Sequence, residues 1–260
     1  MKIEDRVDNF YLKKMIGVLT RTYFLNSGEY SEKNSVLDRI YISDPSYFDN
    51  KHDRRGGIES WPMDADTMIG VYRLVNIYES LKKCIDEGIE GDFVETGIWK
   101  GGACVFANAV MHEFDQQNAR RVHCFDSFEG LPAPYMEEDE GDQHYTFDFL
   151  RISVDQVKEV FSKYKLLTEN AIFRKGFFKD SMKEVEDIEK ICMLRLDGDM
   201  YSSTIEVLEA LYDKVSIGGF VVVDDWILPT ARAAVYDFLN SRGISPEFRI
   251  IDESSIYWIK

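Results

Sequence analysis

The stretch that decides the fold is GDFVETGIWKGGA, residues 91–103. Its first part, GDFVET, is a short apolar run of the kind that forms a strand covered on both faces. A glycine-rich turn follows, and an apolar segment over 102–113 has the pattern of a helix. The stretch therefore predicts a strand, a tight turn and a helix, in that order.

The same alternation continues toward the C-terminus. Further strands are predicted at 121–127, 171–176, 191–197 and 218–225, and further helices at 153–163, 201–214 and 230–241. FRIID and SIYWIK, within 248–260, are expected to close the chain as an antiparallel pair. Strands that alternate with helices indicate an α/β fold with a parallel, doubly wound sheet. A terminal β-hairpin, which brings the sheet to seven strands, is the Rossmann-like arrangement of S-adenosylmethionine (SAM) methyltransferases.

The N-terminal part of the chain has a different character. Apolar periodicity predicts one helix around 8–21, whereas polar and turn-forming residues dominate 44–62. From Asp66 to about Gly88 the apolar residues return to helical spacing. We therefore expect an N-terminal cap or lid over 1–65 and a methyltransferase domain over 66–260.

Composition excludes several classes of function. The 260 residues carry 47 acidic and 31 basic side chains, a formal net charge of −16, so no basic surplus is present to bind nucleic acid or an anionic membrane. The acidity is explained by solubility, or in part by cation binding. The four cysteines lack the spacing of a metal site, which predicts that they are buried free thiols. The sequence has no apolar signal or membrane segment, so we expect a cytoplasmic protein.

Ligands of such sheets bind beyond the carboxyl ends of the strands, so the strand ends matter most. The first strand ends in ETGIWKGG, which is neither the GxGxxG of dinucleotide-binding folds nor a phosphate-binding loop. Asp126 ends the second strand, where a carboxylate can accept hydrogen bonds from both ribose hydroxyls of a nucleoside. Together these features favour SAM over NAD, although a purely structural turn also explains the glycines.

Four acids follow the fourth and fifth predicted strands: Asp197, Asp199, Asp224 and Asp225. Helix capping explains one acid per strand but not two, because like charges this close repel. We therefore predict a divalent metal site, and oxygen ligands favour Mg²⁺. The acidic run over 137–142 is expected to be solvated and His123 to lie in the core. His144 follows the run and is not assigned to the site, although its position there leaves a place near the site open.

Several motifs follow one another along the chain: Trp61-Pro62 with Thr67-Met68, VETGIWKGGA (94–103), FDSFEGLPAP (125–134), KGFFKDS (175–181), LRLDGDMYSST (194–204) and GGFVVVDDW (218–226). In this order they make the chain resemble the macrocin O-methyltransferase family, whose members methylate sugar hydroxyls on macrolide and aminocoumarin antibiotics. The resemblance implies a SAM- and Mg²⁺-dependent O-methyltransferase that is a homodimer. One departure is Asp66, where the family commonly has histidine.

The resemblance also implies roles for individual residues. Asp197, Asp224 and Asp225 would bind the metal, Asp199 would be the general base and Asp126 would hold the ribose. The remaining cofactor-binding residues would be Glu95, Thr96, Gly97 and Gly101 at the methionine end, Ser127, Gly176 and Phe177 beside the adenosine, and Thr67 and Met68 from the capping helix.

These features predict methylation of one hydroxyl of a vicinal diol, on the sugar of a glycosylated natural product such as a macrolide. A bound divalent metal would acidify the hydroxyl, and a carboxylate could then take its proton. The same chemistry on a surface-polysaccharide sugar or a phenolic diol stays open. So does a non-catalytic SAM-binding protein, while an NAD-dependent oxidoreductase fits the first turn poorly.

Overall fold

The computed structural model describes residues 3–21, 65–115, 117 and 119–260. It contains one seven-stranded sheet in the order β3-β2-β1-β4-β5-β7-β6. The strands are β1 (Asp92–Thr96), β2 (Val122–Asp126), β3 (Ala171–Lys175), β4 (Ile191–Leu196), β5 (Val215–Val223), β6 (Arg249–Ile250) and β7 (Ile256–Ile259). The first five are parallel, whereas β7 runs antiparallel to both β5 and β6. The predicted doubly wound sheet with a terminal hairpin is confirmed.

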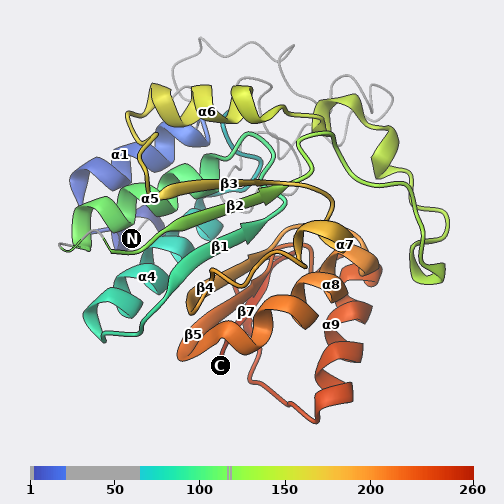
Figure 1. Cartoon of the computed structure of the whole chain (residues 1–260). Helices are drawn as coiled ribbons and strands as arrows, with labels where there is room; N and C mark the ends of the chain where they lie inside the picture. The colour runs from blue at the N-terminus through green and yellow to red at the C-terminus, as the bar shows by residue number, and fades with distance from the viewer. Residues whose placement is uncertain (1–2, 22–64, 116, 118) are drawn as a thin grey trace.

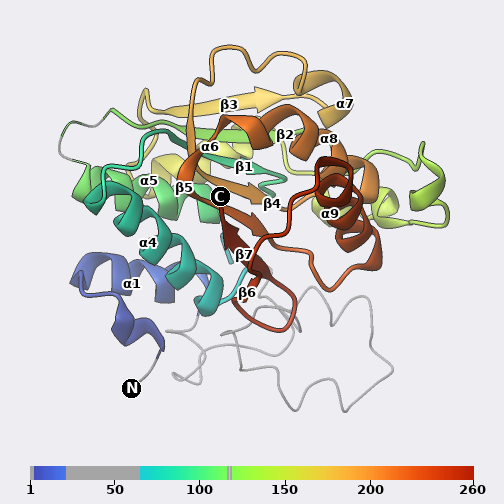
Figure 2. The same ribbon diagram turned by 90° about the horizontal axis from the view of Figure 1, so that it is seen from below.

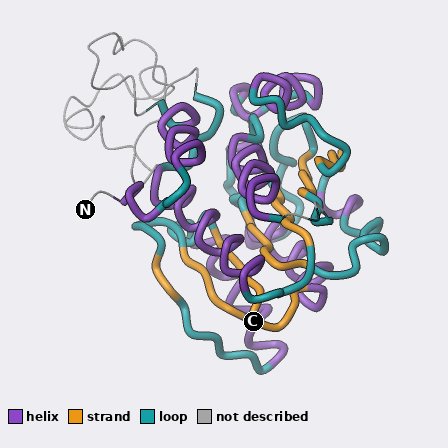
Figure 3. The backbone as a smooth tube through the Cα atoms, turned by 90° about the vertical axis from the view of Figure 1, so that its left-hand side faces the viewer, coloured by secondary structure: helices purple, strands orange, loops and turns teal. Residues whose placement is uncertain are grey.

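Helices cover both faces of this sheet (Figure 1). One layer contains α1 (Phe10–Leu19), α4 (Val71–Asp86), α5 (Gly102–Phe114) and α6 (Val154–Lys163). The other contains α7 (Phe178–Ser181), α8 (Tyr201–Leu211) and α9 (Pro229–Arg242). Figures 2 and 3 show the same layers from two further directions.

Two hydrophobic cores hold the layers together. Phe93 and Val94 are neighbours on β1, yet Phe93 packs into the core under α4 and α5, and Val94 into the core under α8 and α9. Successive side chains of a strand point to opposite faces, so an unbroken apolar strand feeds both cores. This explains why the central strands read as continuous apolar runs in the sequence.

The helix predicted from Asp66 begins later, at Val71. Gly70 is its N-cap and is extended, with φ −86° and ψ −175°. The preceding residues are held out of the helix by other contacts: the Ile69 amide donates to Thr67 Oγ1, and the Asp66 amide donates to the Leu19 carbonyl. The segment 65–70 therefore approaches the carboxyl edge of the sheet as a turn.

Other expectations concern the ends and interior of the chain. α1 confirms the helix predicted near residue 8, but most of the proposed cap, 22–64, lies outside the described residues, and so do Trp61 and Pro62. All four cysteines are buried and free, as predicted. His123 is fully buried and shares a 2.8 Å hydrogen bond with Asp92. In the described part of the chain, every helix is too short or too polar to span a bilayer.

Candidate active site

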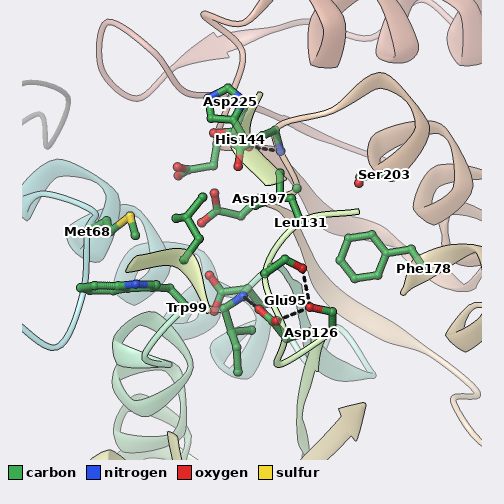
Figure 4. Close-up of a pocket in the computed structure, with 18 of the residues that line it drawn as sticks. Met68, Glu95, Trp99, Asp126, Leu131, His144, Phe178, Asp197, Ser203 and Asp225 are labelled. Carbon is green, nitrogen blue, oxygen red and sulfur yellow. Dashed lines mark hydrogen bonds between the residues drawn. The ribbon is translucent and has the colours of Figure 1, made fainter. Parts of the chain in front are cut away.

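A cavity of about 370 Å³ lies at the carboxyl edge of the parallel strands. Figure 4 shows side chains from several strand ends and loops converging on it. The predicted site residues that line it are Thr67, Met68, Glu95, Gly97, Asp126, Ser127, Gly176, Phe177, Asp197, Asp199, Asp224 and Asp225. Thr96 and Gly101 do not line it. Residues predicted for a cofactor and for a metal thus share one cavity.

The turn after β1 requires glycine at one position above all. Gly97 has φ +85°, and a methyl group there would lie 1.8 Å from the carbonyl oxygen of Asp197. Gly101 also has a positive φ, but its neighbours are Val157 and Phe161, so it shapes the start of α5 rather than the cavity wall. Thr96 is buried, and its hydroxyl donates to the Arg195 carbonyl.

Asp126 stands alone at the end of β2. Its carboxylate accepts hydrogen bonds from the amides of Ile98 (2.9 Å) and Phe128 (2.7 Å). Burial raises its pKa, and these amide donors act in the opposite direction by stabilising the charge. Beside it, the Ser127 hydroxyl donates to the Gly130 carbonyl at 2.5 Å and closes the next turn. The backbone thus fixes the orientation of this carboxylate at the cavity wall.

Glu95 has a different environment although it lines the same cavity. Its side chain is 1% exposed and pairs with Arg195, while the Cys104 thiol donates to its other oxygen at 2.8 Å. Burial raises the pKa of Glu95 and the charge of Arg195 lowers it. Both carboxylate oxygens are therefore engaged by protein groups.

The acids after β4 and β5 form a compact cluster. Asp197, Asp224 and Asp225 each offer an oxygen atom, and these atoms lie within 4.8 Å of one another. The parallel pairing that aligns Leu196 with Val223 brings them together. Burial, and then repulsion from Asp224, raises the pKa of Asp197; burial, and then the charges of Asp199 and Asp197, raises that of Asp225.

Two buried arginines, Arg195 and Arg73, balance part of the negative charge of this cluster. Neither was predicted from the sequence. Arg195 on β4 is 1% exposed and pairs with Glu95, Asp224 and Asp197, the last at 2.6 Å. Arg73 on α4 pairs with Asp224 and, at 2.8 Å, with Asp252. A basic residue inside the apolar run ICMLRL was the available signal for Arg195, because an arginine is rarely buried without a partner.

Asp199 stands in the turn between β4 and α8, with φ +59°. Its amide donates to Asp225 Oδ2 at 2.9 Å, which fixes the turn against the acidic cluster. Burial raises the pKa of Asp199, while the charge of His144 lowers it. A carboxylate with a raised pKa is a stronger base once it has lost its proton, as a proton acceptor in a reaction must be.

The acidic run over 137–142 is less solvated than predicted. Glu137, Glu138 and Glu140 are exposed, but Asp139 is buried and accepts hydrogen bonds from the amides of Tyr201 and Ser202 at the start of α8. A helix start has amides without partners inside the helix, which is why it draws in a carboxylate.

His144 lines the cavity, a place that its position after the acidic run had left open. Its Nδ1 donates to Asp142 Oδ2 at 2.7 Å. Burial lowers the pKa of His144, but the hydrogen bond to Asp142 and the charge of Asp199 outweigh this effect and leave the pKa raised. The interaction with Asp199 places the imidazole in the same part of the cavity.

Comparison with known proteins identifies the family of the chain. Residues 9–260 match the family model described as macrocin-O-methyltransferase (TylF). The chain is 35% identical over 255 residues to demethyldecarbamoylnovobiocin O-methyltransferase of Streptomyces niveus, which covers 96% of this chain and 93% of that protein. It is 37% identical over 206 residues to mycinamicin III 3''-O-methyltransferase of Micromonospora griseorubida, and this match covers 77% of this chain and 80% of that protein.

The fold is also that of a solved relative. The structure of the O-methyltransferase NovP superposes with a TM-score of 0.82 at 34% sequence identity, over 96% of this chain and 98% of that one. The match covers nearly the whole length of both chains. The chain therefore belongs to the macrocin O-methyltransferase family and has the fold of a SAM-dependent methyltransferase.

Proposed function

We propose that this protein is a Mg²⁺-dependent O-methyltransferase that transfers the methyl group of SAM to one hydroxyl of a vicinal diol, on the sugar of a glycosylated natural product. One observation carries the proposal. The cluster of Asp197, Asp224 and Asp225 opens into the same cavity as Gly97 and Asp126, so a metal-bound hydroxyl and a cofactor methyl group could meet there.

The residues present fit a hard divalent cation. All three candidate ligands are carboxylates. Among the described residues, two guanidinium groups, those of Arg73 and Arg195, face six carboxylates of this region: Glu95, Asp197, Asp199, Asp224, Asp225 and Asp252. Arg195 and Arg73 each pair with one carboxylate oxygen of Asp224. Burial, and then repulsion from neighbouring carboxylates, raises the pKa values of Asp197 and Asp225, and a bound cation would relieve that repulsion. When bound, Mg²⁺ would supply Lewis-acid polarisation that lowers the pKa of a coordinated hydroxyl.

The other end of the cavity fits SAM, which supplies an electrophilic methyl group. Asp126 would accept hydrogen bonds from the ribose hydroxyls, and the close turn at Gly97 would admit the methionine portion. Glu95, Thr96 and Gly101 would act mainly by shaping that turn. Ser127, Gly176 and Phe177 would flank the adenosine, while Thr67 and Met68 would approach from the segment before α4.

Within this arrangement Asp199 would be the general base. A carboxylate oxygen of Asp199 would accept the proton from the reacting hydroxyl while the hydroxyl oxygen attacks the methyl carbon, and the bond from that carbon to the sulfur of SAM would break to leave S-adenosylhomocysteine. The hydrogen bond from its amide to Asp225 holds Asp199 next to the acidic cluster. Rigid placement of base, acceptor and methyl group supplies much of the rate in such a displacement.

The acceptor class rests on the relatives and on charge. The relatives named above act on demethyldecarbamoylnovobiocin and on mycinamicin III, as their names state. A cavity rich in carboxylates suits a neutral or cationic hydroxylated acceptor better than a phosphorylated one.

The family resemblance also leads us to propose a homodimer, which light scattering of the purified protein would test.

A methyl-transfer screen tests the proposal. Isotope-labelled SAM would be offered with glycosylated macrolides, simple glycosides with vicinal diols, and catechols, each with Mg²⁺ and with EDTA. We expect transfer to a sugar hydroxyl that EDTA abolishes and added Mg²⁺ restores. Full activity in EDTA would refute the metal, transfer only to catechols would refute the sugar, and SAM binding without any transfer would indicate a silent binding protein.

A further inference from the structure

The segment between β2 and α6 forms one wall of the cavity. It contributes Leu131, Tyr135, His144, Phe147 and Phe149 to the lining. Figure 4 shows Leu131 and His144 on the side of the cavity that carries Asp197 and Asp225. Most of these side chains are apolar or aromatic, so the polar imidazole of His144 is an exception that requires an explanation.

This wall is fixed to the rest of the protein on both sides of His144. On one side, Asp139 accepts hydrogen bonds from the amides of Tyr201 and Ser202, at 2.7 and 3.0 Å. On the other, Trp99 Nε1 donates to the Phe149 carbonyl at 2.8 Å. The wall is thereby tied both to the helix that follows Asp199 and to the turn that follows β1.

His144 is itself held in one orientation. Asp142 Oδ2 accepts from its Nδ1, and Asp142 Oδ1 accepts from its backbone amide at 2.8 Å. The ring also meets Phe147 edge-on, with centroids 5.7 Å apart. Among the described residues Nε2 has no hydrogen-bond partner, and the side chain is 37% exposed. Two hydrogen bonds and a ring contact thus orient a nitrogen that is left available for a ligand.

We propose that His144 is an acceptor-binding residue: its Nε2 hydrogen-bonds a hydroxyl of the acceptor next to the one that is methylated, and Asp142 positions the ring for this contact. The inference rests on the proposed function and adds a specificity determinant to it. A hydroxyl both donates and accepts hydrogen bonds, so it can pair with Nε2 in either protonation state of the imidazole. The ionised carboxylates nearby can only accept.

The test compares His144→Phe with a matched control. Phenylalanine keeps an aromatic ring against Phe147 but removes both nitrogens, whereas His112→Phe makes the same change at an exposed position on α5. With the acceptor found in the methyl-transfer screen, we expect His144→Phe to raise the KM for the acceptor about tenfold, in line with the loss of one hydrogen bond to a ligand. The KM for SAM should stay within about twofold, and His112→Phe should match the wild type.

Asp142→Asn tests the positioning role. Asparagine retains an acceptor for the His144 amide but weakens the hold on Nδ1, so we expect a rise of roughly threefold in the acceptor KM with kcat little changed. An unchanged acceptor KM in His144→Phe would overturn the proposal. An equal rise in the KM for SAM would also overturn it, because a general distortion of the cavity would then explain the loss.

A binding measurement separates this inference from the proposed function. Saturation-transfer NMR would detect methyl α-L-rhamnopyranoside, a simple sugar diol, on the full chain with S-adenosylhomocysteine and Mg²⁺. Binding to the wild type that His144→Phe weakens about tenfold supports the role of His144 even if the screen yields no methyl transfer. Equal binding to both proteins, or no binding to the wild type, contradicts it.

Discussion

Acids at two ends of one cavity occupy very different surroundings. At the end proposed for the cofactor, Asp126 is a single carboxylate that accepts from the amides of Ile98 and Phe128. At the end proposed for the metal, Asp197 and Asp225 lie against further carboxylates, and their pKa values rise because of burial and mutual repulsion. The same residue type at the same edge of the sheet thus suits neutral hydroxyl groups where it is alone and a cation where it is crowded.

Removing the proposed base at the crowded end should have the largest effect. Asp199→Asn is expected to lower kcat by about 10²–10⁴-fold, because the amide cannot accept the proton of the acceptor hydroxyl. Calorimetry should show unchanged affinity for SAM, which would bind at the other end. Steady-state methyl transfer measures the loss of turnover.

The control for this variant is Asp213→Asn. Asp213 is 72% exposed and pairs with Arg242 beside the amino end of β5, on the edge of the sheet opposite the cavity. Its replacement should leave kcat unchanged. If Asp199→Asn also keeps near-normal turnover, Asp199 is not the base, and the crowded end has no chemical role beyond metal binding.

Removing a buried cation from the crowded end should mainly affect stability. Arg195→Met leaves the carboxylates of Glu95, Asp197 and Asp224 without a shared partner, so we expect a loss of about 3–5 kcal/mol in the free energy of unfolding. Urea denaturation measures this loss. Arg242→Met, which breaks an exposed pair with Asp213, should cost less than about 1 kcal/mol. Similar losses in both variants would show that Arg195 does not compensate the cluster.

The fold was predictable because its signals are local and repeated. Each parallel strand contains a short apolar run, and a helix follows each of them, after a few residues for β1, β3, β4 and β5 and after the longer segment 127–153 for β2. The start of α4 was misplaced at Asp66, because the apolar periodicity extends into a segment that instead makes long-range contacts. Asp66 bonds to Lys163 at 2.7 Å and to Tyr164 at 2.6 Å, almost a hundred residues later in the chain.

The candidate site was predictable to the extent that it consists of strand ends. The parallel topology alone brings Asp197, Asp199, Asp224 and Asp225 together. The partners of these acids were missed, because Arg73 comes from a helix before β1 and is joined to Asp224 only by the folded structure. Asp139 was predicted to be solvated and is buried, for the same reason. The sequence of an acidic run does not indicate which of its carboxylates will bind the start of a helix that lies far along the chain.

Weakening the isolated acid should have a smaller effect, confined to the cofactor. Asp126→Asn is expected to reduce the affinity for SAM about tenfold, because an amide offers one acceptor oxygen where the carboxylate offers two. Calorimetric titration with SAM, repeated at several Mg²⁺ concentrations, measures this change. The Mg²⁺ dependence of turnover should match the wild type. A shift in that dependence would mean that the two ends of the cavity are not independent.

The smallest expected effect concerns an acid that serves neither end directly. Asp139→Asn should lower the free energy of unfolding by about 1 kcal/mol, since asparagine can accept only one of the two amide hydrogen bonds at the start of α8 and loses the favourable charge there. Glu138→Gln, an exposed neighbour in the same run, should change it by less than about 0.5 kcal/mol. Because α8 begins directly after Asp199 and Met200, Asp139→Asn should also lower kcat slightly while the affinity for SAM stays constant. Equal free energies of unfolding for the two variants would indicate that Asp139 contributes no more to stability than an exposed residue of the same run.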